Sequence, residues 1–176
     1  MAVSETGFAP ALLTDAAKSL AQRLPVGLCL PVNGGPARQA ASLPVTSELV
    51  DDEFWFMQAP RPQIIIIGAV HISQHLASMA TQSGFDVTVI DPRRTFATAE
   101  RFSGIKLVFD WPDRVLDEMA LDQETALVAL THDPKIDDAA LHLVLGKPLF
   151  HIACLGSRRT HAARLERLAA AGFDAD

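Results

Sequence analysis

The chain has 176 residues, of which 49% are hydrophobic and 20% charged, and its formal net charge is -6. This balance fits one globular domain with a full core, alone or with a short appendage, and excludes a disordered chain. The negative charge gives no electrostatic support for nucleic acid or an anionic membrane as a partner. Cys29 and Cys154 lie far apart without metal-ligand spacing, which favours a reduced protein of the cell interior.

The N-terminal segment has no basic stretch followed by an apolar core, so it does not have the pattern of a secretory signal. No apolar run approaches the roughly 20 residues that a membrane-spanning helix needs. We therefore expect a soluble, cytoplasmic protein without a membrane partner.

Residues 1–58 are expected to form an N-terminal appendage. Leucines at helical spacing predict an amphipathic helix over residues 8–24, with Thr14 and Asp15 as its candidate N-cap. Prolines and the Gly34-Gly35 pair then predict loops and short edge strands, within residues 26–32 and 41–50. A compact hydrophobic strand is expected over residues 54–57, before the breaker at 59–62.

Residues 59–176 are expected to form the main domain, because strands here alternate with helices. The predicted strands are 63–67, 85–90, 105–109, 125–130 and 148–155, and the predicted helices are 70–83, 114–119, 137–145 and 158–171. In the first of these helices, Ile72, Leu76, Met79 and Ala80 are expected to share the buried face. Continuous apolar strands predict a sheet covered on both faces. The fold class is therefore α/β, a Rossmann-type three-layer sandwich with a mostly parallel sheet, plus the N-terminal helix/β appendage.

The turn after the first strand of this domain resembles a dinucleotide fingerprint. Gly68 ends the isoleucine run, Ser73 is the small residue for helix packing, and Asp91 follows the next strand, where an acid binds the ribose. Val70, however, replaces the glycine that lets the backbone approach a pyrophosphate. Two interpretations remain: an anion on the helix N-terminus, or a turn glycine with an acid that caps the next loop.

Further polar residues follow other strands at the same edge of the sheet. Arg93 and Arg94 come after the second strand, Thr131-His132-Asp133 after the fourth, and Gly156 to Arg159 after the fifth. The last segment predicts an anion site, or Ser157 as an N-cap with two solvated arginines. Thr131-His132-Asp133 fits acid–base or metal chemistry, or a loop with a hydrogen-bonded histidine. His71 points into the same crevice or packs on its helix, and no catalytic triad or zinc-spaced cluster can be assembled.

With these segments in view, the chain resembles the C-terminal Rossmann domain of the XdhC/CoxI family, the xanthine dehydrogenase accessory proteins. The likeness covers about residues 54–174. It rests on four segments that occur in the family's order: residues 62–71, 89–102, 129–133 and 155–159.

The resemblance implies a carrier of the molybdenum cofactor, molybdopterin, rather than an enzyme. Members of the family bind this cofactor, protect it during sulfuration and pass it to a molybdenum hydroxylase such as xanthine dehydrogenase, and the family likeness suggests a homodimer. The residues expected to bind the cofactor are Gly68, Val70, His71, Asp91, Arg93, Arg94, Thr131, His132, Asp133, Gly156, Ser157, Arg158 and Arg159. No catalytic residue and no metal ligand is expected, because Cys154 fits a core position better than a metal site.

Three departures from the family pattern are visible. The usual Gly-Ala-Gly-His sequence is here Gly68-Ala-Val-His71, the family's N-terminal domain is absent or reduced to about 50 unmatched residues, and the chain stops at Asp176, where the family normally continues.

Two other functions compete with the carrier. One is an NAD(P)-dependent oxidoreductase or dinucleotide sensor, which rests on the fold alone and is weakened by Val70. The other is a degenerate relative that only binds protein.

Overall fold

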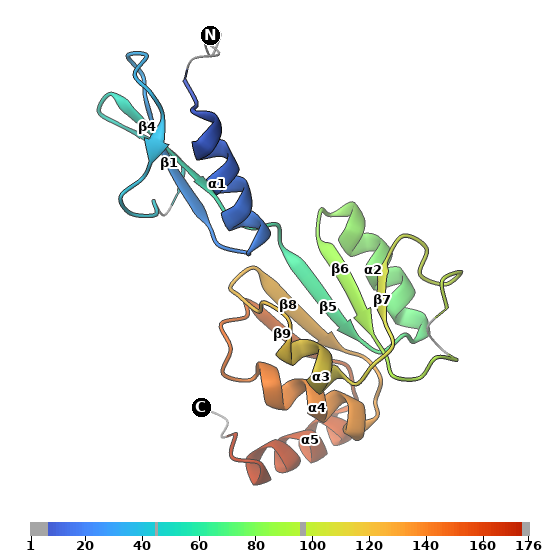
Figure 1. The fold of residues 1–176 in the computed structure, drawn as a ribbon. Coiled ribbons are helices and arrows are strands. Elements are labelled where there is room, and N and C mark those ends of the chain that lie inside the picture. Colours follow the sequence, from blue (N-terminus) through green and yellow to red (C-terminus); the bar gives the residue numbers. More distant parts are fainter. Residues whose placement is uncertain (1–6, 45, 96–97, 174–176) are drawn as a thin grey trace. The chain divides into compact units, whose positions relative to one another are not determined.

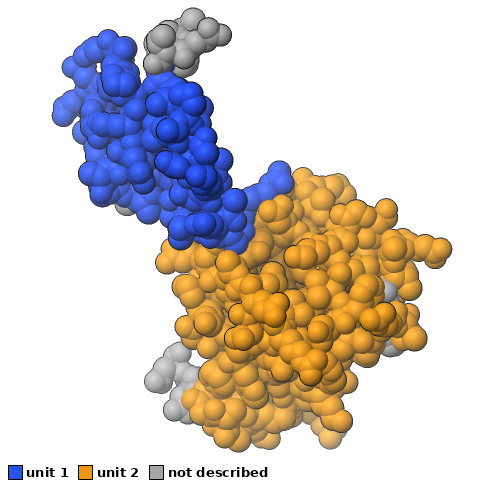
Figure 2. All heavy atoms as spheres, in the orientation of Figure 1, with its two compact units in different colours: residues 1–61 blue, residues 62–176 orange. Residues whose placement is uncertain are grey.

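The computed structural model describes residues 7–44, 46–95 and 98–173. The chain divides into two compact units, Met1–Arg61 and Pro62–Asp176, which Figure 2 shows in different colours. The division falls at the end of the proline-containing segment 59–62, whereas the sequence places it between residues 58 and 59. Each unit is described by itself. No helix in the described ranges combines the length and apolar character required to cross a membrane.

The first unit combines one helix with a four-stranded antiparallel sheet. Helix α1 (Pro10–Ala21) precedes β1 (Val26–Pro31), β2 (Arg38–Gln39), β3 (Glu48–Val50) and β4 (Glu53–Gln58), and the sheet order is β2-β1-β4-β3. The sequence missed β2, which has only two residues. Of the strand expected within 41–50, β3 occupies only the last three positions.

The cap expected for α1 is wrong. The helix begins at Pro10, because proline has no N–H to leave unsatisfied in a first turn and its fixed φ suits the helix. Thr14 therefore lies inside the helix, where its hydroxyl donates to the Pro10 carbonyl at 2.9 Å.

The second unit contains a five-stranded sheet in which every pairing is parallel. The strands are β5 (Gln63–Ile67), β6 (Asp86–Ile90), β7 (Lys106–Val108), β8 (Thr125–Ala129) and β9 (His151–Cys154), in the order β7-β6-β5-β8-β9. The helices are α2 (His71–Gln82), α3 (Pro112–Asp117), α4 (Pro134–Val144) and α5 (Arg158–Ala170). The chain starts at the central strand β5, moves outward to β7 and crosses back to β8, so the direction switches between β5 and β8.

The isoleucine run in β5 feeds both faces of this sheet, because successive side chains of a strand point to opposite sides. Ile64 and Ile66 pack in one core with Ala77 and Ala80 of α2. Ile65 and Ile67 pack in the other core, with residues of α3, α4 and α5. The ribbon shows the same three layers, with α2 on one side of the sheet and the other helices opposite (Figure 1). The predicted Rossmann-type sandwich is thus confirmed.

The face that α2 buries differs from the predicted one. Ser73, Ala77 and Ala80 are its buried residues, whereas Ile72 is 47% exposed and Met79 is 58% exposed. Small side chains let the helix lie close to the sheet, and this close packing places the larger apolar residues at the solvent side.

Candidate functional site

The loops that leave β5, β6, β8 and β9 meet at the carboxyl edge of the parallel sheet and are joined by backbone hydrogen bonds. The Gly68 N–H donates to the Ile90 carbonyl at 2.8 Å, and the Leu130 N–H donates to the Ile67 carbonyl at 2.9 Å. On the other side, the Leu155 N–H donates to the Ala129 carbonyl at 2.9 Å. Four of the sequence-predicted segments are therefore brought to one edge, where ligands of open α/β sheets bind.

Gly68 is required by its own surroundings. Its φ is +106°, which side chains other than glycine rarely adopt, and a Cβ there would lie 2.5 Å from Thr131 Cγ2. The turn is closed by Ser73, whose hydroxyl donates to the Gly68 carbonyl. The glycine thus lets the β5 and β8 loops approach each other, at the switch point of the sheet.

Asp91 is fully buried, and its carboxylate is engaged by the protein. One oxygen accepts from the Ala69 N–H at 2.7 Å, and Arg93 grips both oxygens through Nε and Nη2 at 2.9 Å each. Burial acts to raise the pKa of Asp91, but the bonds from Arg93 and Ala69 outweigh it and the pKa falls below its usual range. In this geometry Asp91 ties the β6 loop to the β5 loop, which occupies the acceptor atoms that a ribose would need.

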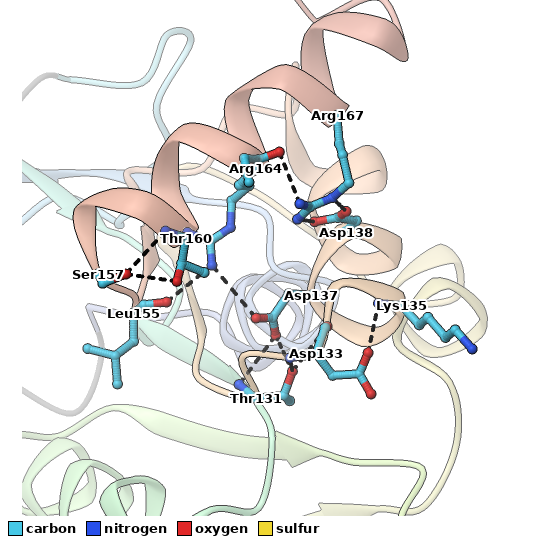
Figure 3. Close-up of polar contacts among 11 residues, drawn as sticks. Thr131, Asp133, Lys135, Asp137, Asp138, Leu155, Ser157, Thr160, Arg164 and Arg167 are labelled. Atoms are coloured by element: carbon cyan, nitrogen blue, oxygen red, sulfur yellow. Dashed lines mark hydrogen bonds and ion pairs between the residues drawn. The ribbon is translucent and has the colours of Figure 1, made fainter.

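A buried polar chain links the β8 loop to the β9 loop (Figure 3). Thr131 donates through its hydroxyl to Asp137 Oδ1 at 2.6 Å, and Arg164 Nη2 lies 3.8 Å from Asp137 Oδ2. The same Nη2 donates to the Leu155 carbonyl at 3.1 Å. Asp137 is 1% exposed and Arg164 is 3% exposed.

Sequence reasoning missed both Asp137 and Arg164. Asp137 reads as an ordinary acid in the first turn of α4, and Arg164 is one of four arginines in α5. Only the position of Arg164 seven residues after Ser157, on the same side of the helix, hinted at a link to the turn. Burial raises the pKa of Asp137, while hydrogen bonds from Thr131 act in the opposite direction.

The remaining residues of the Thr131-His132-Asp133 segment shape the loop. His132 is exposed with φ +59°, and Asp133 is the N-cap of α4, its carboxylate accepting from the Lys135 N–H at 3.0 Å. The Asp133 N–H in turn donates to the Thr131 hydroxyl at 3.0 Å. Asp133 therefore has a structural role, and His132 is the member of the segment that faces solvent.

Ser157 also caps its helix, accepting from the Thr160 N–H at 3.2 Å, while Arg158 and Arg159 are exposed. Ser157 as a cap and the two arginines as solvated groups matches one of the two interpretations of this segment, and it leaves room for the other. Both arginines begin α5, where the free N–H groups of the first helical turn lie.

Two further candidates lie apart from this arrangement. The Arg94 guanidinium lies over the Phe109 ring at 5.7 Å, and the exposed His71 contacts His75 edge to face, with ring centroids 5.1 Å apart. Val70 is the N-cap residue of α2 and offers no side-chain hydrogen bond there. Residues 96 and 97, which fall within the family-like segment 89–102, lie outside the described residues.

Cys154 is a free thiol at the end of β9 and packs against the core that α3, α4 and α5 share with the sheet. Burial raises its pKa, and the nearby Arg164 acts to lower it. Within residues 7–44, 46–95 and 98–173, no group of three or more His, Cys, Asp or Glu side chains could hold a metal ion.

The parallel sheet, its switch point and the loops at its carboxyl edge define a Rossmann-type domain. The family model of the XdhC Rossmann domain matches residues 64–176, and the chain belongs to the XdhC family.

Two known proteins are similar to this chain. A probable xanthine dehydrogenase component of Bacillus subtilis (strain 168) is 31% identical over 110 residues, which are 62% of this chain and 32% of that protein. The crystal structure of a xanthine dehydrogenase from Bacillus halodurans superimposes with a TM-score of 0.70 at 20% identity, over 88% of this chain and 55% of that one. The chain thus spans about a third and about half of the length of these two relatives, and the second likeness supports the fold.

Proposed function

We propose that this protein binds the molybdenum cofactor, in its molybdopterin form, and assists the maturation of a molybdenum hydroxylase of the xanthine dehydrogenase type. In this proposal it is an accessory protein that holds the cofactor during sulfuration and insertion, and it catalyses no reaction of its own. Membership of the XdhC family supports the proposal, as do the names of both relatives, which refer to xanthine dehydrogenase.

One observation carries the proposal: the β8 and β9 loops are tied together from below by the Asp137–Arg164 pair. This tie sets the Thr131 loop and the Gly156–Ser157 turn side by side at the carboxyl edge. A carrier needs such a pre-formed surface, because a ligand that must first order two loops loses affinity to that ordering.

The residues present fit an anionic cofactor. Arg164 has two buried nitrogens without an acceptor, the N-terminus of α5 lies beside Gly156, and Arg158 and Arg159 add positive charge at the same place. Gly156, Ser157, Arg158 and Arg159 would hold the acidic end of the cofactor, and Thr131 and His132 would face its pterin. When bound, the cofactor supplies the molybdenum and its dithiolene, while the protein binds, orients and shields it.

A dinucleotide is the competing ligand, and the arrangement at Asp91 weighs against it. The carboxylate that would bind the ribose is buried and accepts bonds from Arg93 and Ala69. A dinucleotide would have to displace Arg93 from this pair, and removing one partner of a buried ion pair is costly, about 3–5 kcal/mol.

The direct experiment is to purify the protein from cells that make the cofactor and to measure bound molybdenum by mass spectrometry and released pterin by its fluorescence. We expect both in about equal amounts. Thermal unfolding is then followed with NAD(H), with NADP(H) and with the isolated cofactor, since a ligand of the native state raises the melting temperature. Stabilisation by a dinucleotide alone would sink the proposal.

The maturation step is tested by adding the loaded protein to a cofactor-free xanthine dehydrogenase and measuring its activity. Arg94→Ala serves as the matched control, because Arg94 lies on the Phe109 ring, outside the two tied loops. Activation by the loaded protein but not by free cofactor, unchanged in this control, is the expected result. Equal activation by free cofactor contradicts a carrier role.

A further inference from the structure

Arg164 is a buried guanidinium with too few acceptors. Its side chain is 3% exposed, and Nε and Nη1 are the buried side-chain nitrogens of the described residues that have no hydrogen-bond partner. A buried donor without a partner carries its full desolvation cost, and a charged one carries more. Such a group calls for an explanation, and a missing ion or water is one.

The guanidinium lies directly against the turn that begins α5. Nη2 donates to the Leu155 carbonyl at 3.1 Å, and a Cβ placed on Gly156 would lie 3.8 Å from the same atom. Figure 3 shows the side chain running back along the helix toward Ser157 and Thr160, as helical side chains do. Arg164 therefore puts a positive charge behind the turn.

The N-terminus of α5 adds donors on the exposed side of this turn. Ser157 satisfies the Thr160 N–H, and the Arg158 and Arg159 N–H groups precede the first intrahelical bond that α5 can offer. The helix has 13 residues, so its dipole contributes partial positive charge at this end. Gly156 and Ser157 are themselves exposed, so an anion can reach these groups from solvent.

The counter-ion of Arg164 leaves part of its charge unanswered. Asp137 Oδ2 lies 3.8 Å from Nη2, beyond hydrogen-bond distance, and Asp137 Oδ1 is taken up by the Thr131 hydroxyl and N–H. By contrast, Arg167 on the same helix makes a two-point pair with Asp138. Two arginines one turn apart thus differ in that only Arg167 has its charge fully paired.

We propose that the Gly156–Ser157 turn, the N-terminus of α5 and Arg164 form a subsite for a phosphate monoester. This inference rests on the proposed function, of which it names the anchoring point. The same chemistry is presented by the terminal phosphate of the pterin cofactor and by free phosphate or a mononucleotide, so both sources are included in the test.

The sharpest variant changes the charge of the turn and keeps the helix cap. Asp and Asn cap helices about as well as Ser, so Ser157→Asp and Ser157→Asn both preserve α5. Ser157→Asp puts a carboxylate where the phosphate would bind, and we expect it to weaken binding of inorganic phosphate, AMP and the cofactor about tenfold or more. Ser157→Asn is expected to bind all three within about twofold of the unchanged protein.

A second pair of variants tests the buried cation. Arg164→Met is expected to reduce phosphate affinity about tenfold to a hundredfold, which corresponds to losing a charge-assisted interaction. Arg167→Met removes an equal charge from the next turn of α5 and is expected to leave binding unchanged. Affinities are measured by isothermal titration calorimetry, and circular dichroism checks that each variant is folded. If Arg164→Met does not fold, the two Ser157 variants decide the question alone.

The outcomes separate the subsite from the proposed function. Cofactor binding that is equal in Ser157→Asp and in the unchanged protein overturns the subsite and leaves the carrier function standing. Phosphate and AMP binding that is lost as expected, without any cofactor binding, supports the subsite and overturns the carrier function. If neither inorganic phosphate nor AMP binds the unchanged protein at millimolar concentration, the subsite is wrong.

Discussion

Replacing Gly68 with alanine tests the account of the edge at which the loops meet. The added methyl group faces two separate obstacles. The backbone has a φ of +106°, and the new Cβ would lie 2.5 Å from Thr131 Cγ2 and 3.2 Å from the Thr131 nitrogen. Gly84 offers a matched control, because its φ is +91° and a Cβ there would meet nothing within 4 Å.

The two obstacles can be given separate magnitudes. A side chain held at such a φ costs roughly 1–3 kcal/mol, and forcing an extra methyl into a packed site costs roughly another 1–3 kcal/mol. The less flexible unfolded chain returns about 0.4–1 kcal/mol. We expect Gly68→Ala to lower the free energy of unfolding by about 2–5 kcal/mol and Gly84→Ala by about 1–2 kcal/mol.

Urea denaturation followed by tryptophan fluorescence measures these values in the right unit. Trp111 belongs to the second unit and Trp55 to the first, so the Trp55→Phe background restricts the signal to the unit that contains both glycines. The midpoint is compared at constant slope, which shows that stability and not the unfolded state has changed.

Thr131→Ser, which removes Cγ2 and keeps the hydroxyl, completes a double-mutant cycle with Gly68→Ala. We expect it to recover about 1 kcal/mol or more of the loss, since it removes the shortest contact. If Gly68→Ala costs no more than Gly84→Ala, the close approach of the two loops is refuted.

Three further predictions follow from the polar contacts at this edge. Asp91→Asn is expected to cost about 2–3 kcal/mol at pH 7; because the pKa of Asp91 is lowered on folding, this advantage is present above the ordinary carboxyl pKa of about 3.9 and lost as the pH falls through the lower folded value, so denaturation curves of protein and variant should converge in acid. Arg164→Met and Asp137→Asn are each expected to destabilise by about 3 kcal/mol, and the double variant by less than the sum, by about 1–3 kcal/mol, whereas strict additivity in urea titrations would contradict a coupled pair. Val70→Gly is expected to leave NAD affinity in calorimetric titration unchanged, because Arg93 still occupies Asp91, and a gain of tenfold would show Val70 to be the obstacle.

The sequence predicts the second unit well because its signals are strong and local. A run of isoleucines before a glycine and a small-residue helix leaves little choice but a buried parallel strand. The buried face of α2 could not be predicted in the same way. A count of apolar residues favours Ile72 and Met79, while the distance between helix and sheet selects Ser73 and Ala77, and that distance is a tertiary property.

The candidate site was predictable as a set of loops and unpredictable as a set of contacts. Sheet topology brings the segments after β5, β6, β8 and β9 to one edge, and this follows from strand order alone. Which charges become buried depends on helix packing between distant segments. Asp137 and Arg164 are 27 positions apart on two helices, and each looks like a solvated residue until α4 and α5 are in place.

The isoleucine run of β5 has a consequence for how the sheet finds its alignment. Sliding this strand by one residue would exchange the contents of its two faces, yet nearly every exchanged side chain would again be isoleucine. The apolar residues therefore hardly distinguish the correct alignment from its neighbours. The ends of the strand do so: Gln63 donates from its side chain to the Ala120 carbonyl and to Thr125 Oγ1, and Ala69 donates from its backbone to Asp91. The polar groups that close the edge of the sheet thus also act as its ruler, and variants that loosen them should populate shifted strand pairings before the domain unfolds.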